Sequence, residues 1–217
     1  MKSKLMMTAA VAVVMGLGLA SCAGENAKLA GELAGTWKGE TVSMNKEAKD
    51  KTDKDGKRDE RGRREEGQMS CTPTFTFVRT DGTNGGSVDI SAGYTLTRGV
   101  ESAAVAVPVS ATVNGTITAS GTWMAEDGDE VRLTLDPTKT VVDVDTASMT
   151  LNYAQVTDAP RDSLASIRNN VALNIADVVK PMLAAKVQKM RKLDDVKITG
   201  NTMTLEAGHN KVSFTKQ

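Results

Sequence analysis

The side chains with the clearest capacity for chemistry in this sequence are two cysteines, Cys22 and Cys71, and one histidine, His209. A cysteine attacks as its thiolate, which needs a nearby base or cation to form at neutral pH. His209 is the only imidazole available, and its neighbours Gly208 and Asn210 are typical of a turn. One histidine also leaves no second imidazole for a zinc site and no recognisable Ser-His-acid arrangement. We therefore predict no catalytic residue, no metal site, no cofactor and no enzymatic activity.

Cys22 ends the most informative segment of the chain, residues 1–22. Lys2 and Lys4 precede an apolar run of 15 residues, 5–19, and small residues follow that run up to the cysteine. Such a run is too short for a stable membrane-spanning helix and is typical of an export signal. We predict a signal peptide over residues 1–21. An ordinary secretory signal that happens to end in a cysteine is the alternative interpretation.

The four residues Leu19-Ala20-Ser21-Cys22 resemble the lipobox of bacterial lipoproteins very closely. This resemblance implies cleavage before Cys22, a diacylglycerol on its sulfur and usually a third acyl chain on the new amino group. Two or three acyl chains hold a protein on a bilayer far more firmly than one. We therefore expect Cys22 to be a lipidation site, the membrane to be a partner and the bacterial cell envelope to be the location. Ala23 is not an acidic retention signal, which favours the outer membrane and leaves its periplasmic or surface face open.

If Cys22 carries lipid, Cys71 has no partner for an intramolecular disulfide. It lies at the start of a strand-like run that leads to Phe75, and we expect it to be a small buried apolar residue.

Charge and composition exclude several binding functions. Removal of residues 1–21 takes away Lys2 and Lys4, so the 27 basic and 27 acidic residues become 25 and 27. A net charge of −2 gives no electrostatic case for nucleic acid as a partner. Aromatic residues make up only 3% of the chain, which argues against a sugar-binding platform built on stacked rings. We expect a short lipidated tether over residues 22–32 and one domain over 33–217.

Apolar residues alternate with polar ones through most of residues 72–145 and again through 196–214, which predicts antiparallel strands. Turn signals separate the runs, among them Asp81-Gly82 and Gly200-Asn201. Asn114-Gly115 is either a tight turn or a bend within one long strand. The last strands are expected to complete a barrel beside the strand that contains Trp37, because closure removes exposed sheet edges.

Gly35-Thr36-Trp37 opens the first strand-like run and is echoed by Gly121-Thr122-Trp123. Together with Phe75-x-Phe77 and Leu133-x-Leu135, these residues resemble the bacterial lipocalin-like lipoproteins, a calycin-type β-barrel family with an N-terminal lipobox. The resemblance implies a mainly β fold, an antiparallel up-and-down barrel of about 8–10 strands. In it, Gly35, Trp37, Gly121 and Trp123 form the structural family motif, with Trp37 closing one end. Another meander, a sandwich or an open sheet is the alternative.

Residues 46–67 form a strongly charged insertion. Seventeen of the 21 residues from 46 to 66 are charged, and the segment has no apolar residues at the spacing of a helix or a strand. Such a segment buries too little surface to offset the entropy of ordering it, so we predict a flexible insertion. It either arches over the mouth of the barrel as a lid or is simply solvated.

Residues 161–193 have apolar side chains every three or four positions, which predicts one long amphipathic helix before the last strands. Pro181 removes a backbone hydrogen bond inside it, so we expect a kink or two helices that meet there. The apolar face can cover the barrel wall or one end of the barrel. The basic residues of its distal half make the bilayer surface a second choice, and a partner helix is the third.

Three functions are compatible with these predictions, and the third, a hydrolase whose site the sequence does not reveal, ranks below the two that follow. In the first, a lipid-anchored envelope protein binds a small hydrophobic ligand in its barrel, at residues that the sequence does not identify. In the second, the barrel is filled, and the protein is an interaction or assembly module that binds another envelope protein.

The lipobox resemblance makes a direct prediction for Cys22. Cys22→Ser removes the sulfur that would carry diacylglycerol, so this variant should move from the detergent phase to the aqueous phase in phase partitioning. Intact mass measurement should show the acyl chains on the wild type only. Cys71→Ser is the matched control and should stay in the detergent phase. A Cys22→Ser protein that still partitions into detergent would contradict lipidation at this residue.

Overall fold

The computed structural model describes residues 24–44, 68–100, 109–153, 161–207 and 210–217. The predicted signal peptide, Cys22, the charged insertion at 46–67 and His209 lie outside these ranges. A helix over residues 24–33 comes first. The other elements are β1 (Gly35–Gly39), β2 (Val42–Met44), β3 (Gln68–Arg79), β4 (Gly85–Val100), β5 (Val109–Glu126), β6 (Glu130–Leu135), a 3-10 helix (Pro137–Lys139), β7 (Val141–Tyr153), α2 (Arg161–Gln188), β8 (Lys192–Thr199), β9 (Thr202–Ala207) and β10 (Asn210–Lys216).

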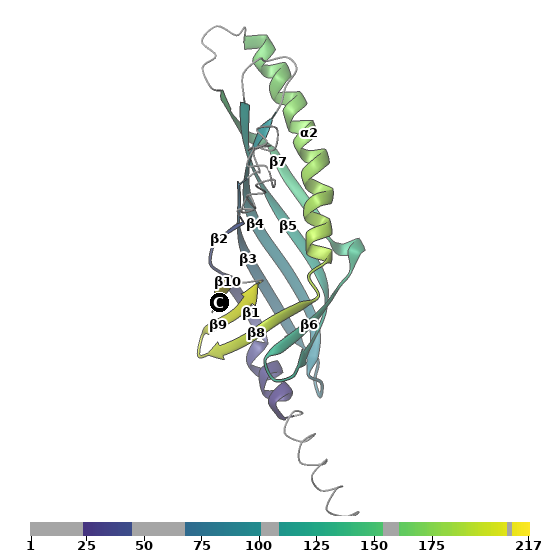
Figure 1. Ribbon diagram of the computed structural model, residues 1–217. Coiled ribbons are helices and arrows are strands. Elements are labelled where there is room, and N and C mark those ends of the chain that lie inside the picture. The colour runs from purple at the N-terminus through teal and green to yellow at the C-terminus, as the bar shows by residue number, and fades with distance from the viewer. Residues whose placement is uncertain (1–23, 45–67, 101–108, 154–160, 208–209) are drawn as a thin grey trace, which may run out of the picture.

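Eight of the strands close into an antiparallel barrel (Figure 1). Following hydrogen-bonded neighbours, the order is β1-β10-β9-β8-β6-β5-β4-β3, and β3 pairs with β1 to complete the circle. The closing pair aligns Trp37 with Phe75, and on its other side Trp37 aligns with Lys216. The prediction of a mainly β antiparallel barrel with one long helix before the last strands is therefore confirmed, and the fold is compatible with a lipocalin-like barrel.

Closure extends over only part of the sheet, because the strands differ greatly in length. β3, β4 and β5 have 12, 16 and 18 residues, whereas β8, β9 and β10 have 8, 6 and 7. Beyond the closed part, β2 continues the line of β1 along β3, and β7 continues the line of β6 along β5. The result is a curved sheet of β2, β3, β4, β5 and β7, which we call the trough. α2 packs against β7 and β5 in this trough (Figure 1).

Buried side chains form two apolar clusters that match these two parts. The closed part is filled by a cluster that includes both tryptophans and three phenylalanines, with Trp37 fully buried and Phe77 only 1% exposed. The trough holds a second cluster, in which strand residues such as Tyr94 and Val113 pack with Val179 and Leu183 of α2. Val187 packs against both clusters, so the apolar interior is continuous. Each fully buried large side chain contributes about 1.5–3 kcal/mol to folding.

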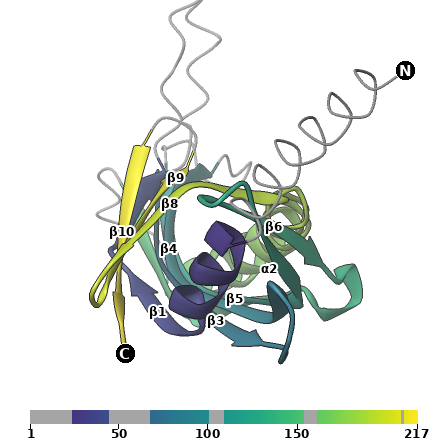
Figure 2. The ribbon, with the colours of Figure 1, turned by 90° about the horizontal axis from the view of Figure 1, so that it is seen from below.

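The N-terminal helix plugs the base of the barrel. Leu29, Ala30 and Leu33 are buried in the barrel cluster, and Figure 2 shows the helix lying across the end of the ring of strands. The structure thus differs from the tether that we expected over residues 22–32, because 24–33 are helical. The signal was present in the sequence. Leu29 and Leu33 are four residues apart, and that spacing places them on one face of a helix.

α2 differs from the expected helix in three respects. It ends at Gln188 rather than at 193, because Lys192 already begins β8. Pro181 lies inside one continuous helix, so the alternative of two helices is wrong. The buried residues of its described part include Val171, Ile175, Val179 and Leu183, whereas Val178 and Met182 are 47% and 38% exposed. The apolar face of α2 is therefore wider than the part of it that the trough covers, and Val178 and Met182 remain exposed to solvent.

The turns agree with the sequence prediction where the structure describes them. Gly82 and Gly200 have φ values of 72° and 59°, which favour glycine over residues with side chains. Asn114 and Gly115 lie inside β5, so the bend in one long strand is correct. Gly115 leaves room for the neighbouring Tyr94 ring, because a Cβ there would lie 2.5 Å from the Tyr94 Cζ atom.

Candidate functional site

Gly35 and Trp37, two of the four residues whose pattern resembles a lipocalin-like motif, hold the N-terminal helix at the base of the barrel. The last carbonyls of a helix have no partner within it and need one outside. Trp37 Nε1 donates to the Leu33 carbonyl at 2.7 Å, and Lys216 Nζ donates to the Glu32 carbonyl at 3.3 Å. The Lys216 ammonium also lies 5.0 Å from the centre of the Trp37 ring. Gly35 has a φ of 128°, a conformation that residues with side chains rarely adopt.

Trp123, the second tryptophan of the motif, fills the barrel beside the phenylalanines. Its ring meets Phe77 edge-on, with 5.5 Å between the ring centres. Trp123 Nε1 is buried and has no hydrogen-bond partner among the residues that the structure describes, an arrangement that costs about 1–3 kcal/mol. Gly121 lets β6 approach, because a Cβ at this position would lie 2.2 Å from the Thr134 carbonyl oxygen. All four motif residues therefore have a packing role, and the closed part of the barrel is occupied by the protein's own side chains.

The other end of the N-terminal helix is attached to the turn between β5 and β6. Asn26 Oδ1 accepts a hydrogen bond from the Gly128 backbone at 2.7 Å. The Lys28 and Glu32 side chains, one turn apart on the helix, form an exposed ion pair at 4.0 Å. The helix is therefore held near its start, along its apolar face and at its end.

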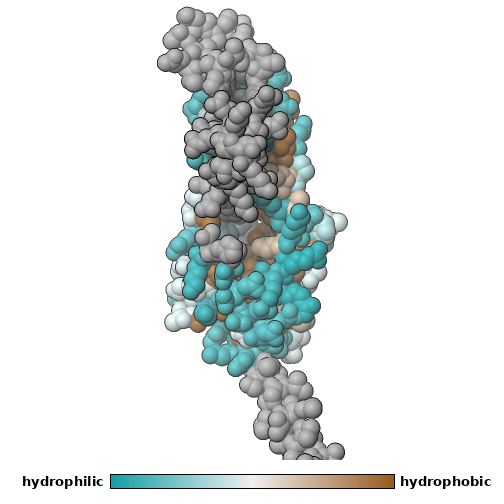
Figure 3. Space-filling model, viewed as in Figure 1, coloured by the Kyte–Doolittle hydropathy of each residue, from teal (hydrophilic) through white to brown (hydrophobic). Residues whose placement is uncertain are grey.

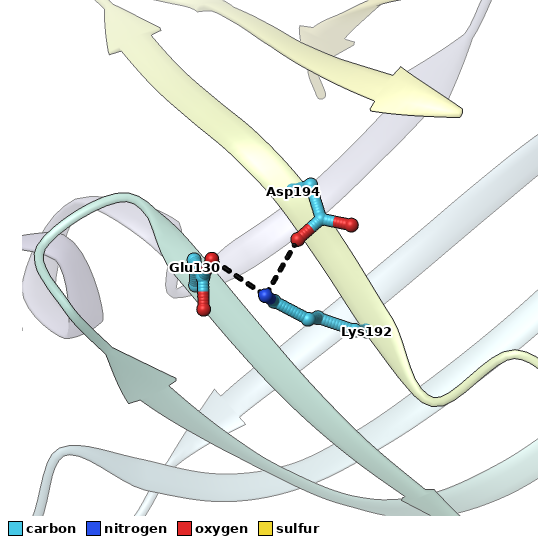
Figure 4. A network of polar contacts seen from close by, with 3 residues as sticks. All are labelled: Glu130, Lys192 and Asp194. Atoms are coloured by element: carbon cyan, nitrogen blue, oxygen red, sulfur yellow. Dashed lines mark ion pairs between the residues drawn. The ribbon is translucent and has the colours of Figure 1, made fainter. Parts of the chain in front are cut away.

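A network of three charged side chains joins β6 to β8 where the barrel resumes after α2 (Figure 4). The ladder between the two strands aligns Val131 with Leu193 and Arg132 with Lys192. On either side of it, the Leu133 N–H donates to the Arg191 carbonyl and the Val196 N–H to the Asp129 carbonyl, each at 2.8 Å. Lys192 Nζ lies 2.5 Å from Glu130 Oε1 and 2.9 Å from Asp194 Oδ1. Hydrogen bonds to Glu130 and then Asp194 raise the pKa of Lys192 above its ordinary value. This network closes a short seam of the sheet, and we assign it a structural role.

α2 presents large apolar side chains to solvent. Leu173 is 65% exposed, and Val178 and Met182 lie four residues apart on another flank. In Figure 3 apolar surface is visible in the upper half of the molecule, where α2 runs, whereas the lower barrel is mostly hydrophilic. The residues of α2 that face the sheet are buried, so the exposed ones are not needed for its packing there.

A hollow of about 630 Å³ lies between α2 and β7, beside Leu173. β7 bulges here, because its register with β5 shifts between Thr112 and Asn114. Asp145 shapes the bulge by accepting hydrogen bonds from the Ala147 and Ser148 backbones, each at 3.1 Å. Hydrogen bonds from Ser148 and then Ala147 lower the pKa of the Asp145 carboxyl. Arg168 Nη2 donates to the Ala147 carbonyl at 2.6 Å and fastens the bulge to α2.

The structure places Cys71 in the trough cluster, 7% exposed, as we predicted for a small buried residue. Burial raises the pKa of its thiol, which disfavours the thiolate that a nucleophile needs. Within the described ranges, no group of three His, Cys, Asp or Glu side chains lies close enough to hold a metal ion.

Three features with structural consequences were not predicted from the sequence. The N-terminal plug had a weak signal in the spacing of Leu29 and Leu33. The Lys192 network had none, because Glu130 and Lys192 are far apart in the chain. The outward positions of β3, β4 and β5 carry threonine and serine at many alternate places, a pattern that predicts strands but does not by itself indicate a site.

Comparisons with protein-family models, with curated proteins and with solved structures found no match for this chain. Among the helical residues that the structure describes, no segment is both long enough and apolar enough to cross a membrane.

Tyr94 leads to a prediction about pH. Burial, followed by the nearby charge of Asp143, raises the pKa of Tyr94 to about 12, and its hydroxyl donates to the Asp143 carbonyl at 2.9 Å. In the unfolded chain this phenol ionises near its ordinary pKa of 10, so its contribution to stability is complete below pH 10. Stability should fall as the pH rises from 10 to about 12. Denaturant unfolding measured across this range should show the fall in the wild type and a smaller one in Tyr94→Phe; equal slopes would contradict the assignment.

Proposed function

We propose that the protein is a lipid-anchored cell-envelope protein that acts through its outer surface, as an interaction module built on a filled barrel. The observation that carries this proposal is the occupied interior. Buried side chains fill the closed part, and α2 packs its own apolar face into the trough. The small hydrophobic ligand of our first sequence-based hypothesis would have to displace some of these groups.

The proposed anchor and the plug have a joint consequence for orientation. Only Ala23 separates Cys22 from the helix at 24–33 in the sequence. Because that helix is packed into the barrel, lipid on Cys22 would hold the base of the barrel close to the membrane. The N-terminal end of α2 lies at the opposite end of the molecule from this helix (Figure 1). In this arrangement α2 would point away from the bilayer, towards other envelope components.

The exposed apolar residues of α2 supply the surface that this function needs. Amphipathic helices commonly bind partners by placing apolar anchors in a groove, with spacings of three or four residues. Val178 and Met182 have that spacing, and Leu173 adds an anchor beside the hollow next to β7. Asp177 and Lys180 are also exposed on this helix, so a groove whose rim carries charges of both signs would suit it. We therefore propose an envelope protein with an apolar groove as the partner.

An apolar ligand in the trough is the second candidate function. It is favoured by the exposed Val178 and Met182, which continue the apolar surface of α2 beyond its buried face. Mouths of β-barrels are common ligand sites, and their walls are mainly apolar. Such a ligand would lie against α2 and would require this helix to shift.

A photo-crosslinking experiment on the full chain in the bacterium distinguishes the two. A photoreactive residue at Leu173 or Val178 should form a covalent adduct with a discrete envelope protein. The same residue at Lys211, exposed on β10, is the matched control and should give none. Leu173→Glu and Val178→Glu should reduce the adduct formed from the other position without lowering Tm. An apolar small molecule extracted from the purified protein, with no protein adduct, would overturn the interaction module in favour of the ligand.

A further inference from the structure

A hollow of about 430 Å³ lies near the middle of β3, β4 and β5. Side chains alternate across a strand, and the neighbouring Cys71 and Tyr94 are buried on the trough side. The hollow therefore opens on the outer face of the sheet, opposite α2. Its lining includes Thr41, Ser70, Thr72, Thr95 and Asn114 together with Gly93, which is exposed and offers only backbone.

The cross-strand register arranges these residues in rows. Thr72 on β3 pairs with Gly93 on β4, which pairs with Thr116 on β5. The next row aligns Ser70 with Thr95 and Asn114. Gly93 therefore has no side chain at a position that is surrounded by hydroxyl and amide side chains.

Hydrogen bonds between the side chains hold these groups in fixed positions. The Thr41 and Thr72 hydroxyls lie 2.8 Å apart, and Thr95 Oγ1 donates to Asn114 Oδ1 at 2.8 Å. A hydroxyl has one hydrogen to donate and two lone pairs to accept with, so each group keeps capacity for a ligand. The surface therefore presents preorganised donors and acceptors without having to order flexible side chains first.

The described residues that line the hollow carry no formal charge at neutral pH. A phosphate, a nucleic acid or an acidic peptide would find no cation there, and a cationic ligand would find no carboxylate. An apolar ligand would cover the hydroxyls without satisfying them. Complementarity of charge and hydrogen bonding therefore favours a neutral ligand rich in hydroxyl groups.

Gly93 gives an independent reason to expect a ligand. A Cβ at Gly115 or Gly121 would lie 2.2 Å from a backbone oxygen, so packing explains those glycines. A Cβ at Gly93 would meet nothing within 4 Å, and its φ is not positive. Glycine weakens the interior of a strand, and it often marks a place where a ligand approaches the backbone closely. The fold does not need glycine at this position, whereas a ligand seated on the β4 backbone does.

We propose that this hollow binds a neutral carbohydrate, with one sugar ring seated over Gly93 and its hydroxyls bonded to the surrounding threonine, serine and asparagine side chains. The Tyr94 ring is buried on the other face, so the site works by hydrogen bonds rather than by stacking. We expect weak binding of a single sugar and stronger binding of a chain that also contacts the neighbouring rows, such as Thr74, Ser91 and Thr118. This inference goes beyond the proposed function, because it needs neither the lipid anchor nor a protein bound to α2.

The test is affinity electrophoresis of the full chain, in a detergent that contains no sugar, through native gels that hold dextran, mannan, amylose or galactan. At least one of these neutral polysaccharides should retard the protein, equally at low and at high salt, because no ion pair is involved. Alginate and heparin are the charged comparisons. Retardation by the charged polymers only, or by none of the neutral ones, would overturn the proposal.

Gly93→Thr separates binding from folding. Threonine favours strands and would fill the hollow without a clash, so Tm should stay the same or rise while affinity falls at least about tenfold. Ser87→Thr, on the same strand and face but six residues away and outside the rows named above, is the matched control and should bind like the wild type. Thr72→Val, which keeps the shape but removes the hydroxyl, should also weaken binding. A Gly93→Thr protein that binds normally, or one that melts at a lower temperature, would overturn the argument.

Discussion

The short C-terminal strands limit how far this sheet can close. β8, β9 and β10 span 8, 6 and 7 residues, so they reach only part of the way along β4 and β5, which have 16 and 18. Where they end, the inner face of the long strands still carries Met69, Leu96 and Val113, which need cover from water. α2 supplies that cover and then leads directly into β8. The apolar inner face of the long strands is therefore covered by short strands in the barrel and by α2 in the trough, and a continuous apolar interior joins the two parts.

The base of the barrel is closed by a different means. Leu29 and Leu33 enter the interior from a helix, and Trp37 and Lys216 satisfy the carbonyls at the end of that helix. The plug unites the two ends of the chain, because Lys216 comes from the last strand. With the base closed, the accessible surfaces are on the outside of the molecule. There α2 presents exposed apolar side chains, and the opposite face of the sheet presents hydroxyl groups.

The fold class was predictable because periodicity is local. Alternation identified the strands, and the three-to-four spacing from Leu164 to Leu193 identified α2, although the helix itself ends at Gln188. The Trp37 and Trp123 motifs and the Gly200-Asn201 turn also lie within short stretches of sequence. What could not be predicted depends on pairing across the chain. Glu130 meets Lys192 only once β6 and β8 are neighbours, and the exposure of Val178 depends on how wide the trough is. The outer hollow could not be predicted either, because it forms only once the strands pair and place Gly93 between Thr72 and Thr116.

Among the residues that the structure describes, buried side chains fill the closed part of the barrel and a helix plugs its base, and we propose that the protein acts through its surface. The most direct test is the free energy of unfolding of Leu33→Ala, measured with denaturant against Glu32→Ala on the exposed side of the same helix. Leu33 is fully buried, so its truncation should lower the free energy of unfolding by about 2–5 kcal/mol, whereas Glu32→Ala should change it by less than about 0.5 kcal/mol. A Leu33→Ala protein as stable as the wild type would show that the helix is not part of the core and would contradict the account.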